Sequence, residues 1–304
     1  MSRAASHDHE HVLSGILCRI GSGLSFSTMG ALFKLASTGG LSAPELVFYR
    51  SLFSLPVVLL WVLKRESVAA LRPNKPMAHV WRSSLGLLSM GLTFQALILL
   101  PLADATAINF TAPIFATVLS FLVLKEHVGI HRWAAVMIGF AGVLIVAKPG
   151  GSSLPAMGVF IALIAATGQA GVTTTLRHLQ RSENVVSIVF WFAVAGIVVG
   201  GMLMPFFAHE RPATDFALVI AGGFFGGVGQ LLMTTSLRAP VSVVSAFDYL
   251  QIVAATIYGW LLFSDVPKLT TMLGAALIAA SGLYTAWREH RRRLREGPTA
   301  VPAV

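Results

Sequence analysis

Charged residues and cysteine are both scarce in this sequence. Only 12% of its 304 residues are charged, about half the proportion found in ordinary globular domains. Hydrophobic residues make up 55%, and the mean hydropathy is +0.76. So few charges cannot cover a water-soluble surface, which makes lipid the solvent for most of the chain. The single cysteine, Cys18, excludes an internal disulfide and argues against a thiolate metal site.

Motifs for catalysis are missing as well. The sequence contains no HExxH, GxSxG or P-loop pattern, and the GSG at 21–23 does not extend into GxGxxG. We therefore expect neither an enzyme nor a bound cofactor. A net charge of +9 would suggest nucleic acid in a soluble protein, but the placement of the basic residues explains it differently, and no nucleic-acid partner is expected.

What the sequence has in abundance is long apolar runs. A helix needs about 20 apolar residues to cross roughly 30 Å of hydrocarbon, and among open structures only helices satisfy their backbone hydrogen bonds in lipid. The segments between the runs are short and carry proline, glycine or charge. The sequence therefore predicts an all-α membrane protein with ten transmembrane helices, at about 13–36, 45–63, 82–100, 104–124, 131–147, 156–176, 184–207, 214–236, 241–263 and 269–287.

The fourth run returns later in altered form. PLADATAINFTAPIFATVLSFLVLKE (101–126) aligns with PVSVVSAFDYLQIVAATIYGWLLFSD (240–265) at a constant offset of 139, with five identities in 26 positions. Both copies share a proline entry, an apolar span and a closing acid. Internal repeats in a membrane protein point to a transporter.

Five spans in each half is an odd number, so the second half should enter the membrane upside down. Inverted repeats give one fold two near-equivalent packings, one open to each side, which is the basis of alternating access. The expected organisation is a flexible cytoplasmic tail (1–12), a first five-helix repeat (13–147), a linker (148–155), a second five-helix repeat (156–287) and a basic cytoplasmic tail (288–304).

The positions of lysine and arginine predict the orientation. With the N-terminus in the cytoplasm, 17 of the 22 basic residues fall on the inner side, as the positive-inside rule requires. Both termini are then cytoplasmic, and the location is a bacterial inner membrane. The RRRLR tail at 291–295 becomes a membrane-facing anchor. The lipid bilayer and a small-molecule substrate are the expected partners, and a homodimer is left open.

At this point the residues resemble the EamA-like drug/metabolite transporter family. The resemblance is carried by LPLADATAINFTAPIF (100–115) with Glu126, by APVSVVSAFDYLQIV (239–253) with Asp265, and by PELVFYRSL (44–52). It implies ten helices in inverted five-helix repeats and movement of small metabolites, often outward. The second copy has Ile252 where the first has Pro113, which leaves open whether the ninth helix bends.

Two charged residues inside the spans are the main candidates for binding substrate. Arg50 lies several residues into the second span, and an intramembrane arginine normally faces a bundle interior or a wet cavity. It suits a carboxylate or phosphate; the alternatives are a structural pair with Glu45 or Asp104 at the outer rim, or a side chain that snorkels outward. Asp248 is an acid deep in a span, where it could hold a coupling proton or a substrate amine, or hydrogen-bond in the neutral form.

Other polar and aromatic residues complete the expected site. The further substrate-binding candidates are Gln95, Gln230, Asn109, Tyr249 and Trp191, and the gating candidates at the outer mouth are Lys34, Asp104 and Tyr49. Packing between helices is the competing interpretation for the glutamines and aromatic residues. The alternating histidines His7, His9 and His11 form a weak candidate metal tract.

Together these features predict a secondary transporter. We expect it to export a small polar or zwitterionic metabolite, an amino acid or an amino-acid-derived metallophore, by alternating access, with proton coupling left open. Arg50 would bind the anionic end of the substrate and Asp248 its amine or a proton. The alternative is an uptake transporter for a vitamin or nucleotide-like metabolite such as riboflavin or S-adenosylmethionine, for which aromatic stacking would dominate.

Overall fold

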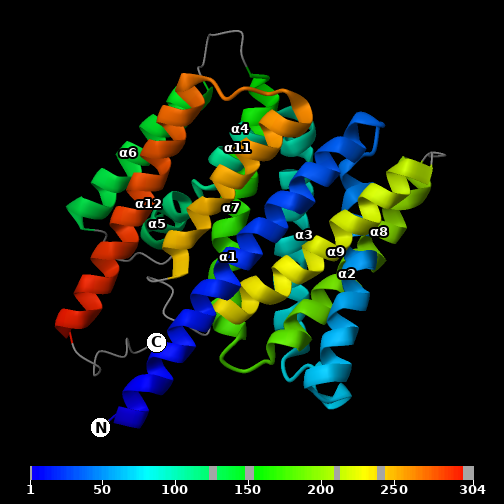
Figure 1. Cartoon of the computed structure of the whole chain (residues 1–304), viewed down its shortest axis with the longest axis horizontal. Helices are drawn as coiled ribbons and strands as arrows, with labels where there is room; N and C mark the ends of the chain where they lie inside the picture. Colours follow the sequence, from blue (N-terminus) through cyan, green and yellow to red (C-terminus); the bar gives the residue numbers. More distant parts are fainter. Residues whose placement is uncertain (1, 123–128, 148–153, 209–212, 238–243, 297–304) are drawn as a thin grey trace.

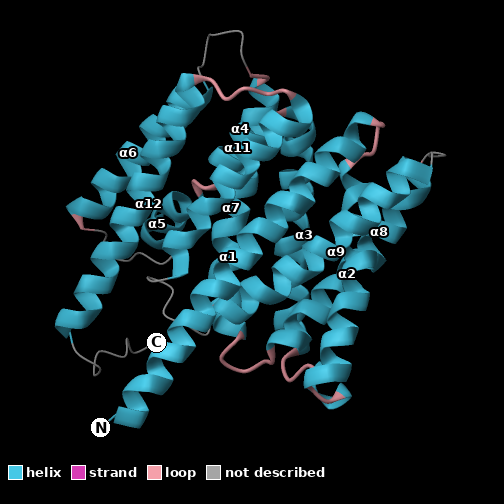
Figure 2. Ribbon diagram, in the orientation of Figure 1, coloured by secondary structure: helices cyan, strands magenta, loops and turns pink. Residues whose placement is uncertain are grey.

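The computed structural model describes residues 2–122, 129–147, 154–208, 213–237 and 244–296 (Figures 1 and 2). The side chains of 2–12, 65, 120, 132, 147, 177, 213, 245, 246, 286, 289, 290 and 292–296 are not described. Throughout these ranges the secondary structure is helical. The elements are α1 (Ser2–Thr38), α2 (Ala43–Arg65), the short 3₁₀ helix η1 (Val68–Leu71), α3 (Pro76–Leu99), α4 (Leu102–Asn109), α5 (Ala112–Leu122), α6 (Ile130–Ala147), α7 (Ala156–Leu179), α8 (Val185–Phe207), α9 (Ala213–Ser236), the 3₁₀ helix η2 (Ser245–Tyr249), α11 (Leu250–Phe263) and α12 (Leu269–Glu296).

The long apolar helices confirm an all-α membrane protein. Seven segments are long and apolar enough to cross a bilayer, and three shorter apolar helices cover Trp133–Val146, Phe247–Phe263 and Leu269–Thr285. Each lies within or overlaps one of the ten ranges expected from the sequence. Large hydrophobic side chains such as Leu60, Phe206 and Leu261 are exposed on the outer faces, as lipid contact requires. It stays a prediction that the chain crosses the membrane ten times and that the second set of five spans is inverted relative to the first.

The first helix begins earlier than expected. Its apolar part starts at Leu13, as the sequence suggested, but the helix itself includes the residues from Ser2 onward. The range 1–12 was expected to be a flexible tail. The side chains of His7, His9 and His11 lie outside the described residues. Within the part of the chain whose side chains are described, no group of three His, Cys, Asp or Glu is placed to hold a metal ion.

The fourth span is broken in the middle, and proline is the cause. Pro113 has no backbone N–H to donate to the carbonyl of Asn109, four residues earlier. Accordingly α4 ends at Asn109 and α5 starts at Ala112. The turn between them is closed by the Thr111 N–H and hydroxyl, which both donate to the Ile108 carbonyl, at 3.0 and 2.7 Å.

The ninth span is irregular at the corresponding place although it lacks this proline. There η2 is a 3₁₀ helix over Ser245–Tyr249 that runs into α11 at Leu250. Asp248 therefore lies in a 3₁₀ segment, whereas its repeat counterpart Asn109 is the last residue of α4, directly before the break. This answers the question left open by Ile252: both copies depart from regular α-helix at matching positions.

The helices pack in pairs that match the internal repeat. Counting spans, α1, α2 and α3 correspond to α7, α8 and α9, and α4, α6 to α11, α12. If each helix is replaced by its counterpart in the other half, the pair α1–α9 becomes α7–α3, and both of these pairs are in contact. In three further pairs, α2–α8, α4–α11 and α6–α12, a helix packs against its own counterpart. Figure 1 shows α6 and α12 side by side at one end of the molecule and α2, α8 and α9 at the other. Such a pattern is typical of two copies related by a two-fold axis.

Glycines allow the closest of these approaches. A Cβ atom added at Gly142 of α6 would lie 2.8 Å from the Gly274 carbonyl oxygen of α12, and one added at Gly274 would lie 2.6 Å from the Gly142 carbonyl oxygen. Both contacts are with backbone, which cannot swing aside as a side chain can. Small residues therefore set the distance between α6 and α12.

We expect Gly274→Ala to destabilise the protein by about 1–3 kcal/mol, because the two helices must separate to admit the methyl group. The measurement is the thermal unfolding midpoint of purified protein in detergent. Gly129→Ala is the matched control, since a Cβ there would meet nothing within 4 Å. Equal midpoints for the two variants would contradict the close-packing explanation.

Candidate functional site

Two buried arginines meet on one aromatic ring inside the bundle. Arg50 of α2 and Arg82 of α3 are each only 2% exposed. Their guanidinium carbons lie 5.1 and 4.0 Å from the ring centroid of Phe192 on α8, so the two charges are at most about 9 Å apart. We call Arg50, Ser51, Arg82 and Phe192 the arginine cluster.

Small residues on the neighbouring helices make room for the cluster. Gly86, one turn beyond Arg82, has no Cβ, and a methyl group there would collide with both the Arg82 guanidinium and Phe192. Gly226 of α9 similarly faces Arg50, where a Cβ would lie 3.2 Å from Arg50 Cγ. The local sequence therefore permits long cationic side chains to lie within a tightly packed core.

Only one of the two arginines is held by hydrogen bonds from its surroundings. Arg50 Nη2 donates to Gln230 Oε1 at 3.0 Å and to the Gly226 carbonyl at 3.5 Å. Arg50 Nε, Arg82 Nε and Nη1, and the Ser51 hydroxyl are buried and unpartnered. Within the described residues, neither arginine forms an ion pair. The expected alternative of an Arg50 pair with Glu45 or Asp104 is therefore wrong.

This arrangement is costly without an added negative charge. Buried charges are normally paired, and two positive charges about 9 Å apart repel by roughly 2 kcal/mol at an effective dielectric constant of 20. A cation–π contact with Phe192 offsets only about 0.5–2 kcal/mol of this unfavourable free energy for each arginine. The unpartnered donors of the two guanidinium groups can be satisfied by an anion. Carboxylate and phosphate groups fit best, because guanidinium donors match their geometry.

The structure does not place Asp248 with Arg50. Asp248 instead pairs with Arg19 of α1, whose Nη2 donates to Asp248 Oδ2 at 2.6 Å and whose Nη1 donates to the Ser236 hydroxyl at 3.4 Å. Arg50 contacts α9 at Gly226, ten residues before Ser236, or about 15 Å along a helix rising 1.5 Å per residue. Arg50 also bonds to Gln230, six residues before Ser236, so about 9–15 Å of α9 separates the contacts of Arg50 from that of Arg19.

The remaining polar candidates have different surroundings. Gln230 joins the arginine cluster through its bond to Arg50, whereas Gln95 is half-buried in α3 and bonds to no described residue. Asn109 Oδ1 is buried without a partner at the break after α4. Next to it, the Phe110 and Tyr249 rings lie 5.3 Å apart between centroids. Trp191 donates its indole N–H to the Leu71 carbonyl at 2.9 Å, which leaves that donor unavailable to a ligand.

The expected gating residues lie where helices end. Lys34 Nζ donates to three carbonyls at the end of α3, those of Leu97, Ile98 and Leu100, at 2.7–3.2 Å; a lysine there also complements the helix dipole. Asp104 accepts from the Thr271 hydroxyl at 2.7 Å. Tyr49 packs against aromatic rings, with Phe216 of α9 at 5.9 Å. Each of the three joins two different helices.

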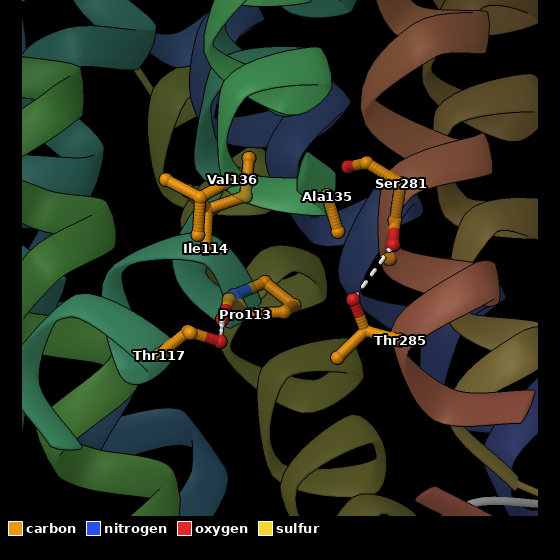
Figure 3. A pocket seen from close by; sticks show the side chains of 8 residues that line it. Pro113, Ile114, Thr117, Ala135, Val136, Ser281 and Thr285 are labelled. Atoms are coloured by element: carbon orange, nitrogen blue, oxygen red, sulfur yellow. Dashed lines mark hydrogen bonds between the residues drawn. The ribbon is translucent and has the colours of Figure 1, made fainter. Parts of the chain in front are cut away.

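A small cavity lies apart from the arginine cluster, between α5, α6 and α12 (Figure 3). It admits the centres of water-sized molecules over about 10 Å³, roughly the room for one water. Its lining is mostly apolar, and the polar Thr117 and Thr285 bond to carbonyls of their own helices at 3.2 and 2.9 Å. This cavity is therefore too small for a metabolite. Its lining consists of Pro113, Ile114, Thr117, Ala135, Val136, Ser281, Gly282 and Thr285.

Sequence reasoning missed Arg82, Phe192 and Arg19. The third span was expected to start at 82, which put Arg82 at its edge. The helix in fact starts at Pro76, a residue favoured in the first turn of helices, so Arg82 lies six residues inside it. That proline was the available signal. Phe192 carries no signal in one sequence, because phenylalanine is common in spans.

A second buried charged group lies outside the spans, between α7 and α8. Lys75 N–H donates to Glu183 Oε1 at 2.6 Å, and Asn74 Nδ2 lies 3.5 Å and His79 Nε2 3.4 Å from Glu183 Oε2. Burial alone raises the pKa of the Glu183 carboxyl, but the interactions with Asn74, Lys75 and His79 outweigh it and hold the pKa below its usual range. Glu183 thus fastens the α7–α8 connection to the start of α3.

We expect Glu183 to make stability depend on pH. Because its pKa is lower in the folded protein than in the unfolded chain, its contribution is complete above the unfolded value, near pH 4.3, and is lost as the pH falls below it. The unfolding midpoint should therefore fall more between pH 7 and pH 3 in the wild type than in Glu183→Gln. Glu66→Gln, at an exposed position, is the control and should keep the wild-type profile.

The chain is similar to known membrane transporters. The EamA-like transporter family matches residues 13–148 and 156–286. The pseudopaline exporter CntI of Pseudomonas aeruginosa is 31% identical over 88% of this chain and 94% of its own length. The riboflavin transporter of Rhizobium johnstonii is 31% identical, covering 91% and 92%, and the S-adenosylmethionine uptake transporter of Rickettsia bellii is 25% identical, covering 81% and 84%.

A solved crystal structure shares the fold. It superposes with a TM-score of 0.67 and 19% identity over 92% of this chain and 99% of the other. The family match covers both halves of the chain and separates them near residue 150, where the sequence places the boundary of the repeat. The chain therefore belongs to the EamA-like transporter family, as a multi-pass membrane protein that transports small molecules and is not an enzyme.

Proposed function

We propose that this protein is a secondary transporter that exports a carboxylate-bearing polar metabolite across the bacterial inner membrane by alternating access. The observation that carries the proposal is the arginine cluster: two guanidinium groups and a hydroxyl, buried among helices and lacking an anionic partner within the described chain. A transporter must satisfy such donors when its substrate is bound. An amino-acid derivative supplies the necessary carboxylate.

The mechanism of transport would follow from the two halves. The helix pairs α1–α9 and α3–α7 change into each other when the two halves are exchanged, and α2–α8 stays the same, which supports two related repeats of five spans each. An odd number of spans makes the second repeat inverted, and the placement of lysine and arginine puts both termini in the cytoplasm. The arginine cluster lies on α2, α3 and α8, which come from both halves. A rocking motion of one half against the other would open the cluster to one side of the membrane and then to the other.

The separation between Arg50 and Asp248 favours the larger of the two expected substrates. The residues of α9 that Arg50 contacts lie about 9–15 Å along the helix from Ser236, which Arg19 contacts, and a long substrate would span this separation better than a free amino acid. An amino-acid-derived metallophore is long enough to contact both. The 31% identical relative named a pseudopaline exporter supports the outward direction. Asp248 would act in coupling, releasing Arg19 when it binds a proton or an amine of the substrate.

Uptake of a planar metabolite such as riboflavin is the second candidate, and one contact favours it. The Phe110 and Tyr249 rings face each other at the irregular points of the two repeat spans, where a flat ligand could stack. In that case Tyr249→Ala would reduce transport more than Arg50→Ala. S-adenosylmethionine fits less well, because its sulfonium charge would be repelled by Arg50 and Arg82.

The experiment that tests export is metabolite profiling of a deletion strain against the same strain complemented with the wild-type gene. The expected result is a carboxylate-bearing metabolite that accumulates inside the deletion strain and is depleted from its medium. Complementation with Arg50→Gln should leave that difference in place, and complementation with Arg288→Gln, which changes an exposed arginine, should remove it. Depletion inside the deletion strain would instead establish uptake.

A further inference from the structure

We propose that the substrate carries two acidic groups, one for Arg50 and one for Arg82. This inference rests on the proposed function and specifies the substrate class of the same site. A zwitterion with one carboxylate and one ammonium group would bring no net charge to a site that holds two positive charges. A substrate with two acidic groups would neutralise both.

The count of charges is the first argument. Where both partners are described residues, the ion pairs are Arg19–Asp248 and His79–Glu183, and neither involves the arginine cluster. Each guanidinium is fully positive at physiological pH and is 2% exposed. Neutralising one of them with a single carboxylate would leave the other as an uncompensated charge in the core.

The distribution of free donors is the second argument. Arg82 Nε and Nη1 are both unpartnered, and Arg50 keeps Nε free after its Nη2 has bonded to Gln230 and Gly226. Free donors therefore belong to both guanidiniums. Ser51, next to Arg50 in the sequence, adds a buried hydroxyl that is also unpartnered. One acidic group at each arginine satisfies the whole set.

The geometry is the third argument. Both guanidinium carbons lie over the Phe192 ring, at 5.1 and 4.0 Å from its centroid, so the acidic groups must be held apart by a short connecting chain. Gly86 and Gly226 leave room beside the two arginines, where an added Cβ would meet Arg82 and Phe192 in the first case and Met29 and Arg50 in the second. Arg50 is further held by Gln230. The site is therefore built for two anionic groups at a limited separation, with Arg82 setting the specificity for the second.

The test compares diacids with their half-amides, which have nearly the same shape and one charge fewer. The probes are succinate and glutarate against succinamate and glutaramate, added to purified full-length protein in detergent while the thermal unfolding midpoint is recorded. We expect the diacids to raise the midpoint and to bind at least tenfold more tightly than the half-amides. Arg82→Gln should abolish this preference, so that diacid and half-amide bind alike, and Arg82→Lys should restore part of it.

The outcomes separate the inference from the proposed function. Equal binding of diacid and half-amide to the wild type would overturn the two-acid inference while leaving a single-carboxylate exporter intact. Failure of both diacids to shift the wild-type midpoint would also overturn it. The proposed function fails separately, if metabolite profiling finds no carboxylate-bearing compound retained by the deletion strain. Because the wild-type comparison needs no variant, it holds even if Arg82→Gln does not fold.

Discussion

Transport by Arg50→Gln should fall by about 10- to 150-fold, the range expected when a charged hydrogen-bonding partner worth 1.5–3 kcal/mol is lost. The glutamine keeps a polar side chain near Gln230 but removes the positive charge and the free Nε donor. The loss should appear as a rise in the substrate concentration needed for half-maximal transport. The measurement is the flux into proteoliposomes of the metabolite that profiling identifies. The expected effect is large because Arg50, in the proposed site, would bind the substrate and also connects α2 to α9 through Gln230 and Gly226.

The control for this variant must lose an arginine without losing the site. Arg288→Gln does so, because Arg288 lies exposed near the end of α12, and its flux should equal that of the wild type. Both proteins should elute as one symmetrical peak on size exclusion. Wild-type flux in Arg50→Gln would show that the arginine cluster is structural and that the substrate binds elsewhere.

The architecture was largely predictable because lipid constrains a chain so strongly. A chain in lipid must form apolar segments long enough to cross the bilayer and must pair all its backbone hydrogen-bonding groups, so few folds are possible and the helices lie where the hydropathy predicted them. The family resemblance drawn from 100–115 and 239–253 is confirmed by the match over both halves. Pro113 pointed to the break between α4 and α5 for a simple reason, a missing N–H. The matching irregularity at η2 could not be foreseen, because no proline marks it.

The site was predictable only in part. Arg50 was found because one intramembrane arginine is a strong signal by itself, whereas Arg82 was hidden by an error of six residues in where α3 begins. The pairing of Asp248 with Arg19 depends on the crossing of α1 over η2, a contact between residues 229 apart. Contacts between distant helices leave no trace in a single sequence. All the expected substrate contacts stay predictions: Arg50, Asp248, Gln95, Gln230, Asn109, Tyr249 and Trp191.

Asp248→Asn is expected to lower the free energy of unfolding by about 2 kcal/mol, because Arg19 would keep its charge without an anionic partner. Fully buried pairs lose 3–5 kcal/mol in this way, but the side chains of Arg19 and Asp248 are 13% and 25% exposed, so water reduces the cost. The measurement is the thermal unfolding midpoint in detergent. Arg19→Gln should give a similar loss, and the double variant should lose less than the sum of the two.

The same variant separates a structural ion pair from a coupling site. If Asp248 takes up a proton during transport, its protonation must release Arg19 from η2, and asparagine would imitate that released state permanently. Flux through Asp248→Asn should then no longer respond to a pH gradient across the proteoliposome membrane, while the wild type responds. Reversing the pair, with Arg19→Asp and Asp248→Arg together, should recover stability, since the attraction is preserved, but not the response to pH, because the acid would move from η2 to α1. A wild-type flux that ignores the gradient would leave Asp248 with the role of holding α1 against the second repeat.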